Sequence, residues 1–144
     1  MVARTIRPIV LCLIRRGEEI LVGKGYDPAQ ERAFYRPPGG GIHFGETSRD
    51  AVVREMREEL GVALENLRYL GIVENIYTFL GRDGHEIALV YEAAFADPTL
   101  YEQVELSAQE EGIGPYRAVW RSPAQMAQEG TPLDPEGLAS LLRM

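Results

Sequence analysis

The chain has 144 residues and a mass of 16.1 kDa, and we expect a single domain over residues 1–144. Hydrophobic residues at 45% and charged residues at 26% exclude a disordered chain. The net charge of −7 argues against a protein that binds duplex nucleic acid through its phosphates. The single cysteine, Cys12, excludes an intrachain disulfide framework and a cysteine zinc cluster.

The longest strongly apolar run, Ile9 to Ile14, is far shorter than the roughly 20 residues that a membrane-spanning helix needs. It is also too short for the core of a signal peptide, and Arg15 and Arg16 follow it without a small-residue cleavage site. We therefore expect a cytoplasmic protein with no membrane partner.

The first half of the chain predicts strands joined by polar turns. Ile9 to Ile14 is continuously apolar, which is typical of a central strand buried on both faces. Glu19 to Gly23 follows a turn and reads as the return strand of a hairpin. Residues 25–33 are expected to form a polar loop, and Phe34 to Arg36 a short strand that ends at two prolines.

A glycine-rich loop over residues 37–47 precedes the clearest helix signal in the sequence. Thr47 and Asp50 have the spacing of a helix capping box. The helix is expected from Ser48 to Leu60, with an apolar stripe along one side, and Gly61 stands where a C-cap glycine is common.

The second half predicts two strands at residues 69–79 and 85–95, joined by a turn at 81–84, and a long acidic loop at 98–114. Tyr116 to Trp120 is expected to be a strand, and helices are expected to begin at Ser122 and at Asp134. The mixture of hairpins and helices indicates an α/β fold with layers around one mixed sheet.

Three carboxylates of the expected helix form its most unusual feature. Glu55, Glu58 and Glu59 fall within an arc of about 100° on a helical wheel, where they repel one another. A hard divalent cation such as Mg²⁺ explains this crowding, because it takes carboxylate oxygens as ligands. Arg54 lies four residues before Glu58 and can pair with it, and Glu46 can reach the same arginine. The pattern therefore suggests a metal–carboxylate site suited to diphosphate cleavage.

Two other interpretations of this segment are weaker. The loop resembles a phosphate-binding Walker A loop in outline, but Glu46 stands where that loop requires a lysine, and its charge would repel phosphate. The charged helix could also be a solvated surface, which is the usual reading of a charge run. The spacing of glycines, glutamates and arginine over the whole segment from Gly40 to Val62 argues against a merely solvated surface.

The segment from Gly40 to Val62 resembles the Nudix box, whose pattern is G-x5-E-x7-R-E-U-x-E-E-x-G-U with U a bulky aliphatic residue. Every invariant position is present, from Gly40 and Glu46 through Arg54-Glu55 and Glu58-Glu59 to Gly61. Met56 occupies a position where Ile, Leu or Val is commoner. The chain is thus similar to Nudix hydrolases, and the resemblance implies an α/β/α sandwich around a mixed sheet.

The resemblance also implies roles for individual residues. Glu58 and Glu59 match the main metal-binding glutamates, and Glu55 matches one that binds metal or acts on the water. Arg54 and Glu46 match a supporting ion pair, and Gly40 lies where a backbone carbonyl joins the metal shell. A further acidic ligand is expected from Glu105, Glu110 or Glu111. The candidate substrate contacts are Arg36, Gly39, Tyr77 and Phe79.

The implied activity is Mg²⁺-dependent cleavage of nucleoside diphosphates linked to another group, with Mn²⁺ able to substitute and a nucleoside monophosphate as product. Thr78 stands where family members that cut ADP-ribose often carry proline, and Phe79 where those that cut dinucleoside polyphosphates often carry tyrosine. Nucleoside di- or triphosphates and dinucleoside polyphosphates are therefore favoured. Alternatives are hydrolysis of ADP-ribose or sugar nucleotides, and a non-catalytic nucleotide sensor. The resemblance is compatible with a homodimer.

Overall fold

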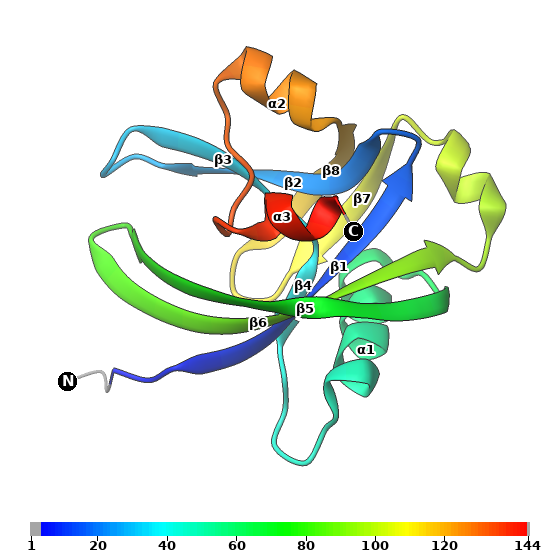
Figure 1. Cartoon of the computed structure of the whole chain (residues 1–144), viewed down its shortest axis with the longest axis horizontal. Helices are drawn as coiled ribbons and strands as arrows, with labels where there is room; N and C mark the ends of the chain where they lie inside the picture. The colour runs from blue at the N-terminus through cyan, green and yellow to red at the C-terminus, as the bar shows by residue number, and fades with distance from the viewer. Residues whose placement is uncertain (1–3, 144) are drawn as a thin grey trace.

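The computed structural model describes residues 4–143, which form a curved, mixed β-sheet with helices against both of its faces (Figure 1). The strands are β1 (Arg7–Arg16), β2 (Glu19–Asp27), β3 (Arg32–Arg36), β4 (Gly39–Gly41), β5 (Leu64–Phe79), β6 (Arg82–Phe95), β7 (Glu105–Glu110) and β8 (Gly114–Arg121). The helices are α1 (Ser48–Leu60), α2 (Pro123–Glu129), α3 (Leu138–Leu142) and the 3₁₀ helix η1 (Pro98–Glu102).

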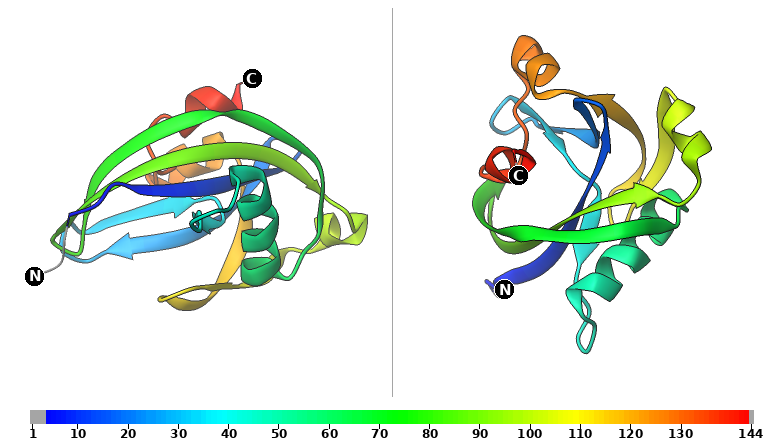
Figure 2. Two further views of the ribbon diagram at one scale, coloured as in Figure 1. Left: turned by 90° about the horizontal axis from the view of Figure 1, so that it is seen from below. Right: turned by 45° about the vertical axis from the view of Figure 1, so that its right-hand side comes forward.

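The strand order is β5-β6-β1-β2-β8-β7, with β3 paired to β2 and β4 paired to β1. β1 and β6 run parallel, whereas the other pairs are antiparallel, so the sheet is mixed as the sequence predicts. α1 lies on one face of the sheet and α3 on the other (Figure 2). The predicted α/β architecture is confirmed.

β1 is the central strand, and the prediction that it is buried on both faces is confirmed. All six residues from Ile9 to Ile14 are buried. Alternate side chains point to opposite faces of a strand, so β1 contributes to two apolar cores. Val10, Cys12 and Ile14 pack in the core that contains Val52 and Met56 of α1. Ile9, Leu11 and Leu13 pack in the core that contains Met126 of α2 and Leu138 of α3.

The largest error of the sequence prediction concerns residues 98–114, which are not a loop. They contain η1 and the edge strand β7, which pairs with β8 over its whole length. Leu106 and Ala108 of β7 are buried, while alternate residues are exposed and polar. An edge strand with a polar outer face has the composition of a loop, which explains the error.

Several predicted boundaries also change. The β2–β3 hairpin extends to Asp27 and resumes at Arg32, so most of the expected polar loop is strand. β4 lies inside the glycine-rich loop, and the β5–β6 turn is shorter than predicted, because β6 already begins at Arg82. The last helix begins at Leu138 and not at Asp134, whose carboxylate instead accepts two hydrogen bonds from the Arg32 guanidinium, at 2.7 and 2.8 Å.

α1 has the bounds that the sequence predicts, and both ends are capped. The Thr47 side chain accepts a hydrogen bond from the Asp50 amide, and Gly61 takes the left-handed conformation at φ 69°. α1 is the longest helix in the structure at 13 residues. Within residues 4–143, no helix combines the length and the apolar character needed to cross a membrane.

Candidate active site

The site is built where the glycine strand β4 lies between β1 and α1. A side chain on Gly40 would place its Cβ only 2.5 Å from the Glu55 carboxylate, and one on Gly39 would place it 2.0 Å from the Val10 carbonyl oxygen. Only glycine allows the backbone to approach so closely on these two sides. The glycine run thus brings the β4 backbone directly against the glutamate face of α1.

Arg54 connects the glutamates of the loop and the helix. Its guanidinium donates to both oxygens of Glu46, at 2.7 and 2.9 Å, and to the Gly41 carbonyl at 2.9 Å. It also donates to Glu55 at 2.9 Å and to Glu58 at 3.1 Å. The ion pairs of Arg54 with Glu46 and Glu58 that the sequence predicts are therefore present.

These contacts change the acidity of the loop carboxylate. The hydrogen bonds from Arg54 and from the His43 amide lower the pKa of Glu46 to about 2. Glu46 therefore stays ionised at neutral pH and orients Arg54, whose own pKa is raised mainly by the same contact.

Glu59 is the buried member of the glutamate set, with only 6% of its surface exposed. One carboxylate oxygen accepts a hydrogen bond from the Gly39 amide at 3.0 Å, and the other accepts one from the Tyr116 hydroxyl. Burial raises the pKa of Glu59 to about 7, and the negative charges of Glu110 and Glu55 add to this rise. The two hydrogen bonds favour the ionised form and act in the opposite direction.

Of the three acidic residues that the sequence left open, Glu110 shares the environment of the helix glutamates. Burial raises the pKa of Glu110, with added effects from Glu86 and Glu55, while Arg36 and Arg7 act to lower it. Glu105 instead pairs with Arg117 at 3.5 Å, and Glu111 lies in the turn after β7. The sequence could not show which of the three residues faces the helix, because it did not predict that residues 105–110 form a strand.

A second group of side chains surrounds Glu86 of β6, a residue that is only 3% exposed. Arg36 and Asn75 donate to the same oxygen of Glu86, at 3.1 and 3.2 Å, and Arg7 approaches the other oxygen at 3.8 Å. The electrostatic effects of Glu86, Arg36 and Arg7 reach Tyr77, whose pKa is raised mainly by burial. The structure thus brings together Arg36 and Tyr77, two of the predicted substrate contacts.

Sequence reasoning missed Arg7, Asn75, Glu86 and the contact of Tyr116 with Glu59. The sequence did carry a signal for Glu86, because it is a charged residue at an inward-facing position of the largely apolar strand β6. Phe79, by contrast, lies at the far end of the β5–β6 hairpin, where its ring packs edge-on against Phe34 at 6.0 Å. It does not join the Glu86 group.

The glutamate face of α1 offers the kind of ligands that a divalent cation needs. Glu55, Glu58 and Glu59 offer only carboxylate oxygens, the ligands that hard cations prefer. Over residues 4–143, no three acidic, histidine or cysteine side chains already converge on one point. Arg54 holds Glu55 and Glu58, but the Glu58 side chain is 55% exposed and has room to turn toward a cation. The residues therefore fit a divalent cation by the chemistry of their oxygen donors, with the exposed Glu58 side chain able to turn toward it.

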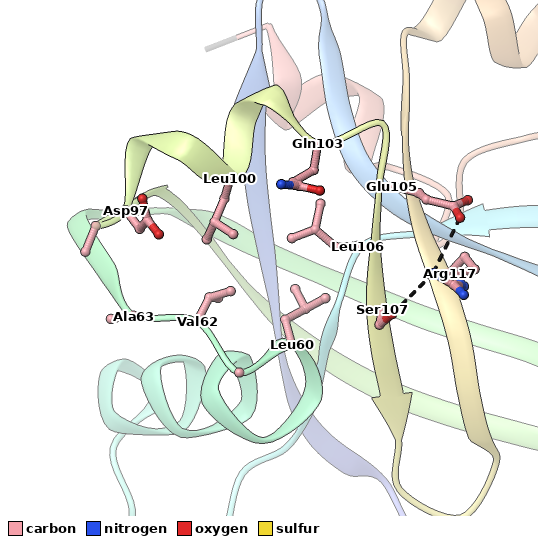
Figure 3. A pocket seen from close by; sticks show the side chains of 12 residues that line it. Leu60, Val62, Ala63, Asp97, Leu100, Gln103, Glu105, Leu106, Ser107 and Arg117 are labelled. Carbon is pink, nitrogen blue, oxygen red and sulfur yellow. Dashed lines mark hydrogen bonds and ion pairs between the residues drawn. The ribbon is translucent and has the colours of Figure 1, made fainter.

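A pocket of about 640 Å³ lies elsewhere, at the C-terminal end of α1 beside η1, β7 and β8 (Figure 3). Leu60, Val62, Leu100 and Leu106 line it together with the Glu105–Arg117 pair. None of Glu46, Glu55, Glu58 and Glu59 is among its lining residues. The glutamates are therefore not part of this pocket.

The family model for the NUDIX domain matches residues 5–141 of the chain. Among solved structures, the MutT NUDIX hydrolase from Burkholderia pseudomallei aligns with a TM-score of 0.66 at 23% identity, covering 96% of this chain and 97% of that one. A NUDIX hydrolase from Nitrosomonas europaea aligns with a TM-score of 0.67 at 17% identity, covering 96% and 87%. At these identities the alignments establish the fold alone.

The curated relatives include proteins named NAD-capped RNA hydrolase NudC. The Haemophilus influenzae (strain PittEE) protein is 39% identical over 67 residues, which cover 44% of this chain and 25% of that protein. The Pseudomonas syringae pv. tomato protein is 30% identical over 100 residues, covering 69% and 33%. The chain thus matches a quarter to a third of the length of these two relatives. The family match over nearly the whole chain, together with the intact glutamate helix, shows that the chain belongs to the Nudix hydrolase family.

Proposed function

We propose that the protein is a Mg²⁺-dependent pyrophosphohydrolase that cleaves the diphosphate bond of nucleoside diphosphate derivatives. Nucleoside di- and triphosphates and dinucleoside polyphosphates are the favoured substrates, and the product is a nucleoside monophosphate. The observation that carries this proposal is the placement of Glu55, Glu58 and Glu59 on one face of α1, against the glycine strand β4. Folding alone does not favour such a concentration of like charges.

In this proposal Glu58, Glu59 and Glu55 hold Mg²⁺, or Mn²⁺ in its place, with the Gly40 carbonyl and Glu110 completing the set. When bound, the cation neutralises phosphate charge and lowers the pKa of a bound water. Arg54 and Glu46 orient the glutamates through the contacts described above. Hydrolysis forms a bond between the water oxygen and one phosphorus and breaks the bridging P–O bond. The hydrogens of the water are divided between the two products and the medium.

Arg36, Gly39 and Tyr77 are proposed to contact the substrate, and Arg7 joins them, whereas Phe79 packs against Phe34 at the tip of the β5–β6 hairpin. Glu86 carries one negative charge, which Arg36 and Asn75 already satisfy by hydrogen bonds. Arg7 is beyond hydrogen-bond distance of Glu86, and its side chain is 60% exposed. The exposed guanidinium of Arg7 beside Glu86 is therefore available to an anionic substrate.

Other members of the class remain as alternatives. Hydrolysis of ADP-ribose or of sugar nucleotides uses the same glutamates and differs in the contacts to the group beyond the diphosphate. A non-catalytic sensor would bind nucleotide without turnover, and the complete glutamate set counts against it.

The test is product analysis with a substrate panel in Mg²⁺ or Mn²⁺, with and without a chelator. The panel contains nucleoside di- and triphosphates, dinucleoside polyphosphates, ADP-ribose, sugar nucleotides and NAD. It also contains NAD-capped RNA, because curated relatives carry that name. We expect release of a nucleoside monophosphate from at least one nucleoside polyphosphate, and its loss with chelator. Tight nucleotide binding without turnover in either metal would instead establish the sensor.

A further inference from the structure

Tyr116 of β8 reaches across the sheet to the most buried glutamate of α1. Its hydroxyl donates a hydrogen bond to one oxygen of Glu59, while the Gly39 amide of β4 donates to the other oxygen. The Glu59 carboxylate is therefore held from two sides by groups of two different strands. A buried carboxylate with both oxygens engaged has little freedom to rotate.

The sequence of a third strand makes this contact possible. Gly23 of β2 lies under the Tyr116 ring, and a Cβ at this position would be 2.7 Å from the ring carbon Cε2. Any side chain at residue 23 would force the ring or the backbone to move. β2, β4 and β8 thus each contribute one feature to the placement of a single carboxylate.

The Tyr116 hydroxyl is held against the Glu59 carboxylate. Burial and the neighbouring charge of Glu59 both raise the pKa of the phenol well above its ordinary value. The hydrogen bond from this hydroxyl favours the ionised form of Glu59.

We propose that Tyr116 is a positioning residue, which holds the Glu59 carboxylate in the orientation that binds the divalent cation. This inference rests on the proposed function, in which Glu59 is a cation ligand. Groups that hydrogen-bond to metal ligands orient them, and their removal typically weakens metal binding by about 10–100-fold. Tyr116 would act through Glu59 and would not touch the substrate.

The experiment is an equilibrium titration of the purified protein with Mn²⁺, followed by electron paramagnetic resonance of the free ion. Tyr116→Phe removes the hydroxyl and keeps the ring. We expect its Mn²⁺ dissociation constant to rise about 10-fold or more, and its turnover to recover at high Mn²⁺ concentration.

Tyr91→Phe is the matched control. The Tyr91 hydroxyl is hydrogen-bonded at 2.6 Å to Ser48, at the other end of the same helix, so it contacts α1 without contacting a glutamate. We expect its Mn²⁺ affinity to stay within about 3-fold of the wild type. Gly23→Ala provides a second perturbation, because it displaces the ring while the hydroxyl remains. Introduced alone, Gly23→Ala should weaken Mn²⁺ binding. Introduced together with Tyr116→Phe, it should weaken binding little further.

The outcomes separate the two proposals. Glu59→Gln is included to test whether Glu59 binds the ion at all. If Glu59→Gln weakens Mn²⁺ binding while Tyr116→Phe binds as tightly as the wild type or more tightly, the positioning role is wrong and the proposed function stands. If the wild type binds no Mn²⁺, both proposals are overturned. Equal losses of Mn²⁺ affinity in Tyr116→Phe and Tyr91→Phe would show a general effect on α1 and would also contradict the positioning role.

Discussion

Arg54 shows how one side chain organises several carboxylates. Its planar guanidinium presents five donors, which here serve Glu46, Glu55, Glu58 and the Gly41 carbonyl. A lysine at this position would provide a single point charge and could not bridge the same acceptors. The arginine therefore sets the geometry of the loop and the helix together.

The Arg54–Glu46 contact predicts a particular dependence of stability on pH. The pKa of Glu46 is about 2 in the folded protein, below its ordinary value of 4.5. The stabilisation is therefore complete above about pH 4.5 and is lost as the pH falls toward 2. In Arg54→Gln, Glu46 loses the main cause of its lowered pKa, so the free energy of unfolding should fall less over this interval.

This prediction is checked by urea unfolding at several pH values between 5 and 2. Arg117→Gln, which removes an arginine of β8 with a 64% exposed side chain, is the control for loss of positive charge. Equal pH slopes for the wild type and Arg54→Gln would contradict the role given to Arg54.

At the scale of residues, the sequence identified the helix glutamates but not all of their partners. Arg54, Glu55, Glu58 and Glu59 lie on one helix, so helical spacing was enough to bring them together, and Glu46 stands just before that helix. Tyr116, Glu110 and Glu86 reach the site from β8, β7 and β6. Their approach depends on strand order and register, which no local pattern encodes.

α1 and its two caps form the element on which the proposed activity depends most. The Thr47 side chain accepts a hydrogen bond from the Asp50 amide at 3.1 Å and closes the first turn. At the other end Gly61 stops the helix two residues after Glu59, in the left-handed conformation that glycine favours. The caps therefore determine where the glutamates stand relative to β4.

Substitution of the N-cap is expected to affect both stability and turnover. Thr47→Ala should lower the free energy of unfolding by about 1 kcal/mol, because the first turn of α1 loses its side-chain acceptor. Ser122→Ala is the matched variant, because Ser122 caps α2 in a full capping box away from the glutamates. It should cost a similar amount of stability and leave turnover unchanged.

Chemical denaturation and steady-state kinetics test this pair together. A loss of turnover in Ser122→Ala as large as that in Thr47→Ala would show that the effect is general and does not come from α1.

Elements with a strong local signal were predicted well, and those stabilised by their neighbours were not. α1 has apolar periodicity and caps, and β1 has an uninterrupted apolar run, so both were predicted at the right place. β7 is polar on its outer face and is a strand because it pairs with β8. β4 consists of three glycines, and its backbone is ordered by pairing with β1.

Over the whole molecule, β1 joins the two cores of the structure. Its odd-numbered apolar residues face α2 and α3, and its even-numbered ones face α1. Both helix layers therefore depend on the same strand, and damage to either face should be transmitted to the complete fold.

Leu11→Ala and Ile14→Ala test this two-sided arrangement, because the two side chains are buried in different cores. Each should lower the free energy of unfolding by about 2–5 kcal/mol. Ile76→Ala, at a residue that is 76% exposed, should change it by no more than about 0.5 kcal/mol. Urea denaturation of the three variants is the measurement, and a small effect of either core variant would show that one face contributes little.

The most direct test of the central claim is the turnover of Glu58→Gln on the best substrate of the panel. Glu58 is the most suitable of the helix glutamates, because among residues 4–143 its exposed side chain bonds only to Arg54. Asp50→Asn removes the same charge from the first turn of the same helix and is the control. We expect Glu58→Gln to fold normally and to lose at least about 100-fold in kcat, while Asp50→Asn stays close to the wild type. A folded Glu58→Gln protein with full activity would contradict metal-dependent catalysis by this glutamate set.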